Sequence, residues 1–343
     1  MQNVLAKGRL LDDQGKLLQA GYSTEYARTY RRDDIKASKW RIKEWDYYLV
    51  SDGERALAFT LSDIGYLALA SISLVDLKEK NFVTKTGISP FPFGKHNFPS
   101  DFNKGDVGFE CGNIAISMRN DGKARRIKAE CKNFKDGKNF FAEITLSQPP
   151  RDAMVIATPF PGNDLAFYYN AKVNCMTASG YYEIGDEMTV LDATKSLGTL
   201  DWGRGVWPYS NTWYWSSMQH RTENGGTIGF NLGYGFGDTS QATENMFFVN
   251  GRAHKLNNVD FGIPGKGRKA DLMKPWLFTD DEGRLEMTFT PAVNRRDVTN
   301  VGIICTAQNQ VFGHFSGHVV LDDGSKLQFE NCAGFAEKVV NRW

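Results

Sequence analysis

The chain has 343 residues, and its 41 Lys and Arg nearly balance its 40 Asp and Glu, so the formal net charge is +1. This balance gives no sign of a nucleic-acid partner or of binding to an anionic membrane surface. No segment reaches 18 uninterrupted apolar residues, so no membrane span is expected, and the first residues lack the apolar core of a signal peptide. Five cysteines without a CxxC pair indicate free thiols, which favours a cytoplasmic protein.

The first strongly patterned segment is RIKEWDYYLV at 41–50, which is predicted to be a strand. Side chains of a strand alternate between its two faces. One face therefore carries Lys43, Trp45 and Tyr47, and the other carries Glu44, Asp46 and Tyr48. Large aromatics on both faces indicate that both are covered, as where a barrel packs against a second domain. The carboxylates Glu44 and Asp46 either flank a cavity or lie in solvent. The solvated arrangement, with Arg41 and Lys43 as partners, is the favoured one.

Turn residues recur along the rest of the chain and separate short strands. Hairpins are predicted at Asn120-Asp121-Gly122, at Asp136-Gly137 and at Asp322-Asp323-Gly324, each between two strand-like runs. Helical periodicity is confined to 23–39 and 332–343, where short helices are expected. Turns at this density predict an all-β fold built from antiparallel sheet.

The second half of the chain repeats patterns of the first half in the same order. Four matched pairs carry this repeat: 43–50 with 211–218, 56–63 with 227–238, 73–82 loosely with 246–256, and 143–154 with 286–298. Each match is weak alone, but their common order predicts two similar β-domains. We place the N-terminal domain at residues 1–165 and the C-terminal domain at residues 166–343.

The densest aromatic cluster is LGTLDWGRGVWPYSNTWYW at 197–215, where four tryptophans surround the carboxylate of Asp201. A carboxyl group against indole walls loses hydration, which favours its neutral form. Asp201 could then hold a proton near neutral pH and donate it as a general acid. In the alternative interpretation, Asp201 forms an ion pair with Arg204 in a loop, and the tryptophans belong to the core.

Motifs for metals and cofactors are weak in this sequence. His314 and His318 have a spacing that places them on one face of a strand, but no third ligand is placed for them, so no metal site is expected. GYGFGD at 233–238 lacks the spacing of a dinucleotide motif, and GIPGKGRK at 262–269 lacks the Ser or Thr of a phosphate-binding P-loop. We therefore expect no cofactor.

From GRLLDDQGKLLQAGY at 8–22, through both aromatic clusters, to GFAEKVVNRW at 334–343, the chain resembles a bacterial family designated domain of unknown function 2804. More distantly, it is similar to the hydroxyneurosporene synthase (carotenoid 1,2-hydratase) and AttH-like group. That resemblance implies two consecutive lipocalin-like antiparallel β-barrel domains, with short flanking helices in this chain. Members of the group protonate isoprenoid double bonds, catalyse cyclisations or bind lipids.

The motifs of this group carry over only in part. KEWDYYLV matches the group's N-terminal strand rich in Glu, Trp and Tyr, and LDWGRGVWPYSNTWYW matches its second-domain segment. After Asp201 the chain continues with Trp202-Gly203 and lacks the histidine of that segment. The resemblance therefore implies a role for the Asp201 carboxylate but supplies no polar partner for it.

Together these patterns predict an apolar, aromatic-lined cavity near the domain junction. The leading hypothesis is an enzyme, a hydratase or a cyclase or isomerase, that acts without a cofactor on a hydrophobic small molecule of isoprenoid or polyketide type. A lipid or isoprenoid carrier without chemistry is the alternative, and a carbohydrate-active or carbohydrate-binding protein is the third hypothesis. The catalytic candidates are Asp201, Tyr209 and Glu44. The ligand-binding candidates are Trp45, Tyr47, Tyr48, Trp202, Arg204, Trp207, Asn211, Trp213 and Trp215. The sequence does not indicate an oligomeric state.

Overall fold

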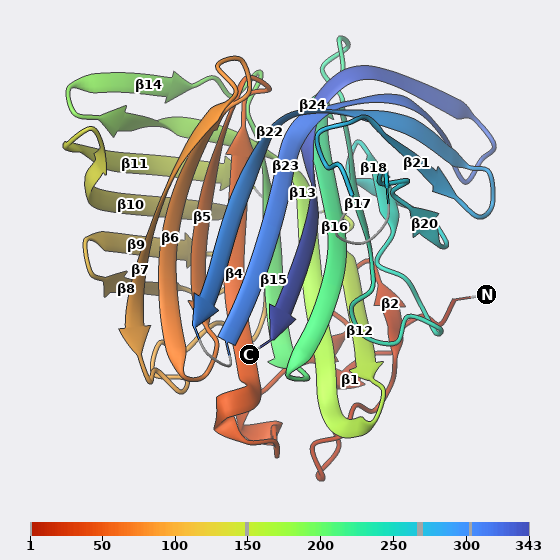
Figure 1. The fold of residues 1–343 in the computed structure, drawn as a ribbon. Coiled ribbons are helices and arrows are strands. Elements are labelled where there is room, and N and C mark those ends of the chain that lie inside the picture. The colour runs from red at the N-terminus through yellow and green to blue at the C-terminus, as the bar shows by residue number, and fades with distance from the viewer. Residues whose placement is uncertain (1, 148–150, 266–269, 302–303, 343) are drawn as a thin grey trace.

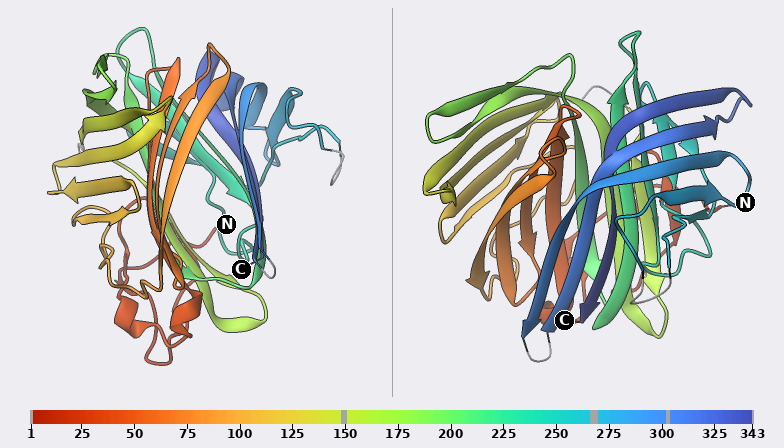
Figure 2. Two further views of the ribbon diagram at one scale, coloured as in Figure 1. Left: turned by 60° about the vertical axis from the view of Figure 1, so that its left-hand side comes forward. Right: turned by 45° about the horizontal axis from the view of Figure 1, so that its top comes forward.

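The computed structural model describes residues 2–147, 151–265, 270–301 and 304–342. Within these residues the chain forms two large antiparallel sheets, one of 13 strands and one of 9 strands, and a small two-stranded sheet (Figure 1). The all-β class predicted from the turn pattern is therefore confirmed. Both large sheets curve strongly, so that each approaches a barrel (Figures 1 and 2).

The first sheet follows the order β7-β6-β5-β4-β15-β13-β11-β10-β9-β8, with β12, β14 and β2 attached beside this path. Its strands are β2 (Gly21–Ser23), β4 (Ile42–Ser51), β5 (Arg55–Asp63), β6 (Leu67–Asp76), β7 (Asn81–Pro90), β8 (Val107–Cys111), β9 (Ile114–Asn120), β10 (Ala124–Lys135), β11 (Lys138–Ser147), β12 (Met154–Phe160), β13 (Asn163–Ile184), β14 (Glu187–Leu191) and β15 (Leu197–Val206). The central position of β4 and β15 explains why their residues are almost all buried.

The second sheet follows the order β19-β18-β17-β16-β24-β23-β22-β21-β20. Its strands are β16 (Ser210–Arg221), β17 (Thr227–Tyr234), β18 (Met246–Val249), β19 (Arg252–Lys255), β20 (Val259–Asp260), β21 (Trp276–Asp280), β22 (Leu285–Val301), β23 (Ile304–Val320) and β24 (Lys326–Arg342). The remaining elements are β1 (Gly8–Arg9), β3 (Arg28–Thr29) and the 3-10 turns η1 (Arg32–Asp34) and η2 (Lys39–Arg41).

All three predicted hairpins form, and each has a glycine where the backbone needs one. The turns join β9 to β10, β10 to β11, and β23 to β24. Gly122, Gly137 and Gly324 adopt φ values of 91°, 78° and 82° there. These values lie in the left-handed region that only glycine enters without steric cost, so the turn residues were a reliable indication of strand connections.

The two predicted helices are wrong. Residues 332–343 fall largely in β24, which hydrogen-bonds to β16 on one side and to β23 on the other. Pairing with two neighbouring strands outweighs the helical propensity of Ala, Glu and Lys in this segment. Within 23–39 the structure contains the one-turn helix η1, the short strand β3, the last residue of β2 and the first residue of η2.

The internal repeat corresponds to equivalent strands of the two sheets. The matched segments 43–50 and 211–218 lie in β4 and β16, and each of these strands continues into an antiparallel meander, β4-β5-β6-β7 and β16-β17-β18-β19. The chain passes from the first sheet to the second between Val206 and Ser210. The predicted division into domains at 165/166 remains a prediction.

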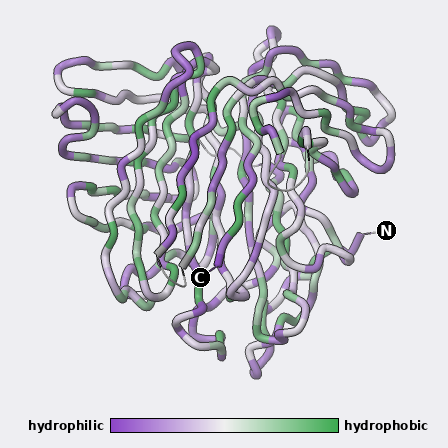
Figure 3. The backbone as a smooth tube through the Cα atoms, viewed as in Figure 1, coloured by the Kyte–Doolittle hydropathy of each residue, from purple (hydrophilic) through white to green (hydrophobic). Residues whose placement is uncertain are grey.

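The two sheets lie face to face and are joined by an apolar cluster between them. This cluster consists of Tyr47, Leu49, Ala56, Ala58, Val75, Leu77, Trp215, Val293, Phe312 and Phe335. In the left view of Figure 2, strands β4–β7 and β22–β24 approach each other at the top and diverge below. Figure 3 shows hydrophobic stretches along the strands of both sheets and hydrophilic turns at their outer ends.

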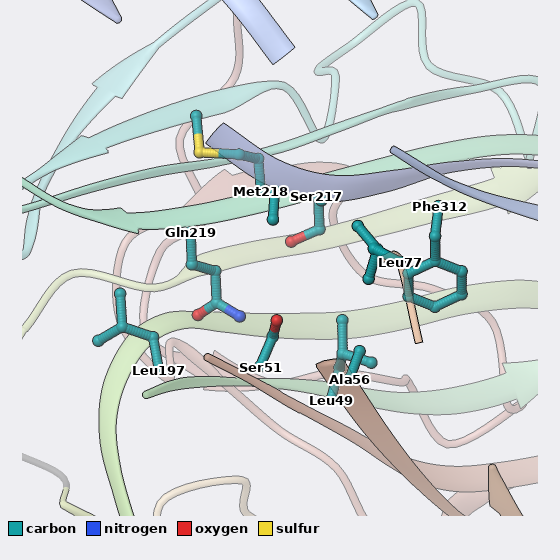
Figure 4. Close-up of a pocket in the computed structure, with 11 residues that line it drawn as sticks. Leu49, Ser51, Ala56, Leu77, Leu197, Ser217, Met218, Gln219 and Phe312 are labelled. Carbon is teal, nitrogen blue, oxygen red and sulfur yellow. The ribbon is translucent and has the colours of Figure 1, made fainter. Parts of the chain in front are cut away.

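The approaching ends of the sheets are almost completely filled by side chains. The cavity there has a volume of only about 20 Å³. It is lined by Leu49, Leu77, Leu197, Phe312 and neighbouring side chains (Figure 4). Such a volume holds no more than about one water molecule. The sheets are therefore sealed at this end, and the larger space between them lies further along the same strands.

Candidate active site

A cleft of about 630 Å³ lies between the two sheets. The first sheet contributes β4–β7, β13 and β15 to its walls, and the second contributes β16 and β22–β24. Along β4 the lining changes from Leu49 and Ser51 at the sealed end to Trp45 and Tyr47 at the cleft. Its size is that of a small-molecule binding site.

One half of the cleft is lined by aromatic rings in mutual contact. Trp45 stacks on Tyr168 at 5.9 Å between ring centroids and meets Trp207 edge-on at 4.7 Å. Phe236 and Tyr47 continue this surface, at 5.3 Å from Trp213 and 5.8 Å from Trp215, respectively. These rings hold one another in place, so the wall is rigid and presents π faces to a ligand.

The glycine beside Asp201 makes room for this aromatic wall. Gly203 of β15 lies opposite Trp45 of β4 in the sheet. A Cβ atom on Gly203 would lie 1.9 Å from Cζ2 of the Trp45 indole, so any other residue would displace the ring. The glycine thus permits the close approach of an indole to the strand that carries Asp201.

Asp201 is held by an ion pair within the first sheet. Its strand partner is Lys172 of β13, whose Nζ lies 2.7 Å from Asp201 Oδ2, and Asn170 Nδ2 donates to Asp201 Oδ1 at 2.7 Å. The Lys172 ammonium also lies 3.9 Å from the ring centroid of Trp215, a cation–π contact. Asp201 therefore does not pair with Arg204, in contrast to the loop ion pair considered from the sequence, and it accepts hydrogen bonds in a fixed geometry.

Glu337 of β24 is a buried carboxyl group that lines the cleft. Its Oε1 accepts a hydrogen bond from Trp213 Nε1 at 2.7 Å, and its Oε2 accepts one from Gln310 Nε2 at 3.2 Å. Burial raises the pKa of Glu337 to about 7, although the Trp213 hydrogen bond opposes this shift. Burial disfavours the charged carboxylate, and the positive charges of Arg295 and Lys172 oppose this effect only in part.

A third carboxyl group, Glu244, lies at the same half of the cleft. Its Oε2 accepts from Asn231 Nδ2 at 3.3 Å, and Asn231 Oδ1 in turn accepts from Trp215 Nε1 at 2.7 Å. Burial raises the pKa of Glu244, and the positive charge of Lys172 opposes this shift. Burial and the negative charge of Asp201 raise the pKa of both Glu244 and Glu337, whereas the Lys172 ammonium lowers it, and the net effect favours a proton on one of the glutamates.

The predicted site residues divide between the cleft and the opposite face of the same strands. Six of them line the cleft: Trp45, Tyr47, Asp201, Trp207, Trp213 and Trp215. Four alternate with these along β4 and β15 and point to the other side of the sheet: Glu44, Tyr48, Trp202 and Arg204. Tyr209 is 43% exposed beside the start of β16, and Asn211 is buried against Pro208 and Asn341.

The opposite face of β4 and β15 is a closed polar network. Glu44 pairs with Arg32 and accepts a hydrogen bond from Tyr30 Oη at 2.8 Å. Arg204 Nη2 lies 2.9 Å from Asp46 Oδ1. The prediction that Glu44 and Asp46 lie in solvent with Arg41 and Lys43 is therefore wrong. Both carboxylates are buried, because the first sheet curves around this face and encloses it.

Sequence analysis missed Lys172, Glu244 and Glu337, which are three of the seven charged residues that line the cleft. Lys172 is a single charged residue in the strand-like run LAFYYNAKVNCM, and this isolation was the available signal. Glu337 lies in the segment that was predicted to be a helix. The face on which its side chain lies was therefore not predicted. Glu244 lies outside the strands, just before β18, and had no pattern to mark it.

The motifs considered for metals do not form a site in the described residues. No group of three or more His, Cys, Asp and Glu side chains there is arranged to hold a metal ion. His314 and His318 both lie in β23, and burial lowers the pKa of His314. Residues 266–269 of the GIPGKGRK motif lie outside the described residues. Among the described helices, none has the length and apolarity to cross a membrane.

The fold and cleft define a class of protein, with two lipocalin-like β-domains whose sheets face one another. Two solved structures share this architecture with the chain. One is an AttH-like protein of Nitrosomonas europaea, 13% identical, with a TM-score of 0.53 over 90% of this chain and 95% of that one. The other is kievitone hydratase of Nectria haematococca, 12% identical, with a TM-score of 0.51 over 93% of this chain and 97% of that one.

Within this class the chain belongs to the family described as domain of unknown function 2804, whose model matches residues 1–343. No curated protein sequence matches the chain. The resemblance to this family and the distant resemblance to the AttH-like group are thus confirmed. At these low identities the likeness to solved structures establishes the fold.

Proposed function

We propose that the protein is an enzyme that protonates a hydrophobic small molecule in the cleft, with Glu337 as the general acid. The single observation that carries this proposal is the Glu337 carboxyl group, whose pKa is raised to about 7 and which faces an aromatic-lined cleft. A general acid works best when its pKa lies near the operating pH. The products of such a step are those of hydration, isomerisation or cyclisation.

In this mechanism Glu337 donates its proton to an alkene carbon of the substrate. The electron pair of the double bond forms the new C–H bond, and the adjacent carbon becomes a cation. The π faces of Tyr47, Trp213 and Trp215 line the cleft at this point and stabilise the cation. In a hydration, water then adds to the cation, and the proton that it releases returns to the Glu337 carboxylate.

Asp201 takes a different role from the one expected from the sequence. Its two oxygens already accept hydrogen bonds from Lys172 and Asn170. An acceptor fixed in this way suits the binding and orientation of a water molecule better than proton donation. We therefore propose Asp201 as the group that positions water, and Glu337 as the group that holds the transferable proton.

The carrier hypothesis required a cleft without carboxyl groups and a solvated Asp201–Arg204 pair. The cleft instead contains Asp201, Glu244 and Glu337, and Arg204 lies on the other face of the sheet. Buried carboxyl groups cost stability, so a site that only carried lipids would gain nothing from them. The name of one solved structure with this fold, a hydratase, agrees with the proposed reaction class.

The test begins with native mass spectrometry of protein purified from its host, which identifies a bound apolar molecule as the starting substrate. Turnover of that molecule is then followed in heavy water by deuterium incorporation. We expect Glu337→Gln to lower kcat by about 100-fold or more, because glutamine keeps the shape of the side chain and cannot donate the proton. Glu143→Gln makes the same change at an exposed position of β11 and serves as the control. It should leave kcat unchanged.

The pH dependence gives a second criterion. A general acid must be protonated, so kcat should fall as pH rises through about 7, the pKa of Glu337. Full turnover by Glu337→Gln, or a rate that is flat across this range, would show that Glu337 is not the acid.

A further inference from the structure

The wall of the cleft that carries Glu337 continues through two further polar side chains. Arg295 of β22 lies opposite Gln310 of β23, and Gln310 lies opposite Glu337 of β24. The three strands lie side by side in Figure 1. Directly opposite residues of antiparallel strands have their Cβ atoms about 5 Å apart and point to the same face. All three side chains line the cleft, so they form one continuous polar row.

Two buried atoms of this row have no hydrogen-bond partner among the described residues. Arg295 Nη1 donates to Ser73 Oγ at 2.7 Å, while Arg295 Nε is buried and unpaired. Gln310 Nε2 lies within hydrogen-bond distance of Glu337 Oε2 and Tyr47 Oη, while Gln310 Oε1 is buried and unpaired. A buried donor or acceptor without a partner is rare and calls for an explanation.

The first sheet presents a matching polar surface across the cleft. Thr60, Ser71 and Thr86 lie opposite one another on β5, β6 and β7, and all three line the cleft. Ser71 Oγ and Thr86 Oγ1 are 3.1 Å apart. The cleft thus has an aromatic wall at Trp45, Trp207, Trp213 and Trp215, and elsewhere it offers hydroxyl, amide and guanidinium groups among apolar side chains such as Leu69, Phe82 and Ile88.

We propose that the substrate is amphipathic, with an apolar part among the tryptophans and an oxygen-bearing end bound by Arg295 and Gln310. An acceptor oxygen, as in a carbonyl or carboxylate, receives the Arg295 Nε–H, and a neighbouring hydroxyl donates to Gln310 Oε1. This inference rests on the proposed function and narrows its substrate from hydrocarbons to oxygenated molecules. A pure hydrocarbon would leave both buried groups unpaired, which costs binding free energy.

The inference is tested with two fluorescent dyes that share one skeleton. 8-Anilinonaphthalene-1-sulfonate carries an anionic oxygen acceptor group, and N-phenyl-1-naphthylamine lacks it. Both gain fluorescence in apolar sites, so dissociation constants follow from titration of the full-length protein. We expect the wild type to bind the sulfonate dye about tenfold or more tightly than the neutral dye, the effect of one hydrogen bond to a charged group.

Variants of Arg295 show whether this preference comes from the proposed contact. Arg295→Met should remove the preference and leave the affinity for the neutral dye within about twofold of wild type. Arg295→Lys keeps the charge but lacks the Nε donor, so it should restore only part of the preference. Arg119→Met removes one positive charge from the exposed face of β9 and should leave both affinities unchanged.

Three results would overturn the inference. The first is equal affinity of the wild type for the two dyes, which is expected if water molecules pair with the buried atoms of the row. The second is an equal loss of affinity for both dyes in Arg295→Met. The third is that neither dye binds. The dye preference should persist in Glu337→Gln, whose turnover is lost. If the wild type shows no dye preference but Glu337→Gln still abolishes turnover, the proposed substrate class is refuted and the general acid is not. If the dye preference is present but Glu337→Gln keeps its turnover, the general acid is refuted and the substrate class is not.

Discussion

Strands β4 and β15 bury charged side chains on both faces, and the two faces differ in what surrounds the charges. On the closed face, Asp46 lies 2.9 Å from Arg204, and Glu44 pairs with Arg32. The Arg204 guanidinium donates further hydrogen bonds to the backbone oxygens of Trp45, Gly203 and Pro99, the first at 2.7 Å. Every charge there has a fixed partner, and the face has a structural role.

On the cleft face the set of ion pairs is incomplete. Lys172 pairs with Asp201, while Glu337 is buried with only neutral hydrogen-bond donors, Trp213 and Gln310. A carboxyl group in such surroundings titrates near neutral pH. The comparison teaches that burial of charge alone does not mark a site. Buried groups that are left without a charged partner, next to an open volume, do.

The largest effect is expected on the closed face. Arg204→Met should lower the free energy of unfolding by about 3–5 kcal/mol, because it leaves the buried Asp46 without its cation. Urea unfolding at neutral pH measures this change. A loss below about 1 kcal/mol would mean that the closed network is not structural, and the contrast between the two faces would fail.

On the cleft face, stability should depend on pH through Glu337. Its folded pKa of about 7 exceeds the reference value of 4.5, so its contribution to stability is fully present below about pH 4 and is lost as pH rises through about 7. Relative to Glu337→Gln, the wild type should lose about 3 kcal/mol of unfolding free energy between about pH 4 and pH 8.

The difference between the two proteins is the informative quantity in that experiment, since all other titrating groups are shared. Parallel pH curves for wild type and Glu337→Gln would show that Glu337 titrates normally, and that the cleft face is as fully paired as the closed one.

A smaller effect is expected from Gly203→Ala, which tests the shape of the cleft without changing a charge. The new methyl group would meet the Trp45 indole, so the ring must leave its stack on Tyr168. We expect a loss of about 1–3 kcal/mol in unfolding free energy, together with a changed tryptophan emission spectrum. Unchanged stability and emission would show that the aromatic wall is adaptable instead of rigid.

The smallest effect is expected outside both faces, at Tyr209. This side chain is 43% exposed and does not line the cleft, although the sequence placed it among the catalytic candidates. Tyr209→Phe should change the unfolding free energy by less than about 0.5 kcal/mol and leave kcat within about twofold. A tenfold loss of turnover would show that Tyr209 does contribute to the reaction.

The fold was predictable because local patterns specify its turns and strands. Aromatic residues on both faces of β4 correctly indicated a strand covered on both sides, and the order of repeated segments indicated two related sheets. The helix predicted at 332–343 failed because β24 pairs with β23, to which a hairpin joins it, and on its other side with β16, which is distant in sequence. Pairing over such distances leaves no trace in local periodicity.

The site was predictable only where its residues cluster in sequence. The tryptophans near Asp201 stood out, and Trp213 and Trp215 do line the cleft. The face of each residue was not resolved, since Trp202 and Arg204 alternate with Asp201 and point away. Lys172 and Glu337 reach the same cleft from β13 and β24, and only the paired sheets bring them close to Asp201.

The long strand β13 ties the two sheets together at one irregular point. Its pairing with β15 slips between Val173 and Met176, where Cys175 adopts φ 60°. In this bulge Asn174 Nδ2 donates to Ser217 Oγ at 2.9 Å, and the Cys175 backbone N–H donates to Gln219 Oε1 at 2.7 Å, both on β16. Lys172 directly precedes this junction. The two walls of the cleft come from different sheets, so a chain divided between the sheets would have neither a complete cleft nor Asp201 and Glu337 together.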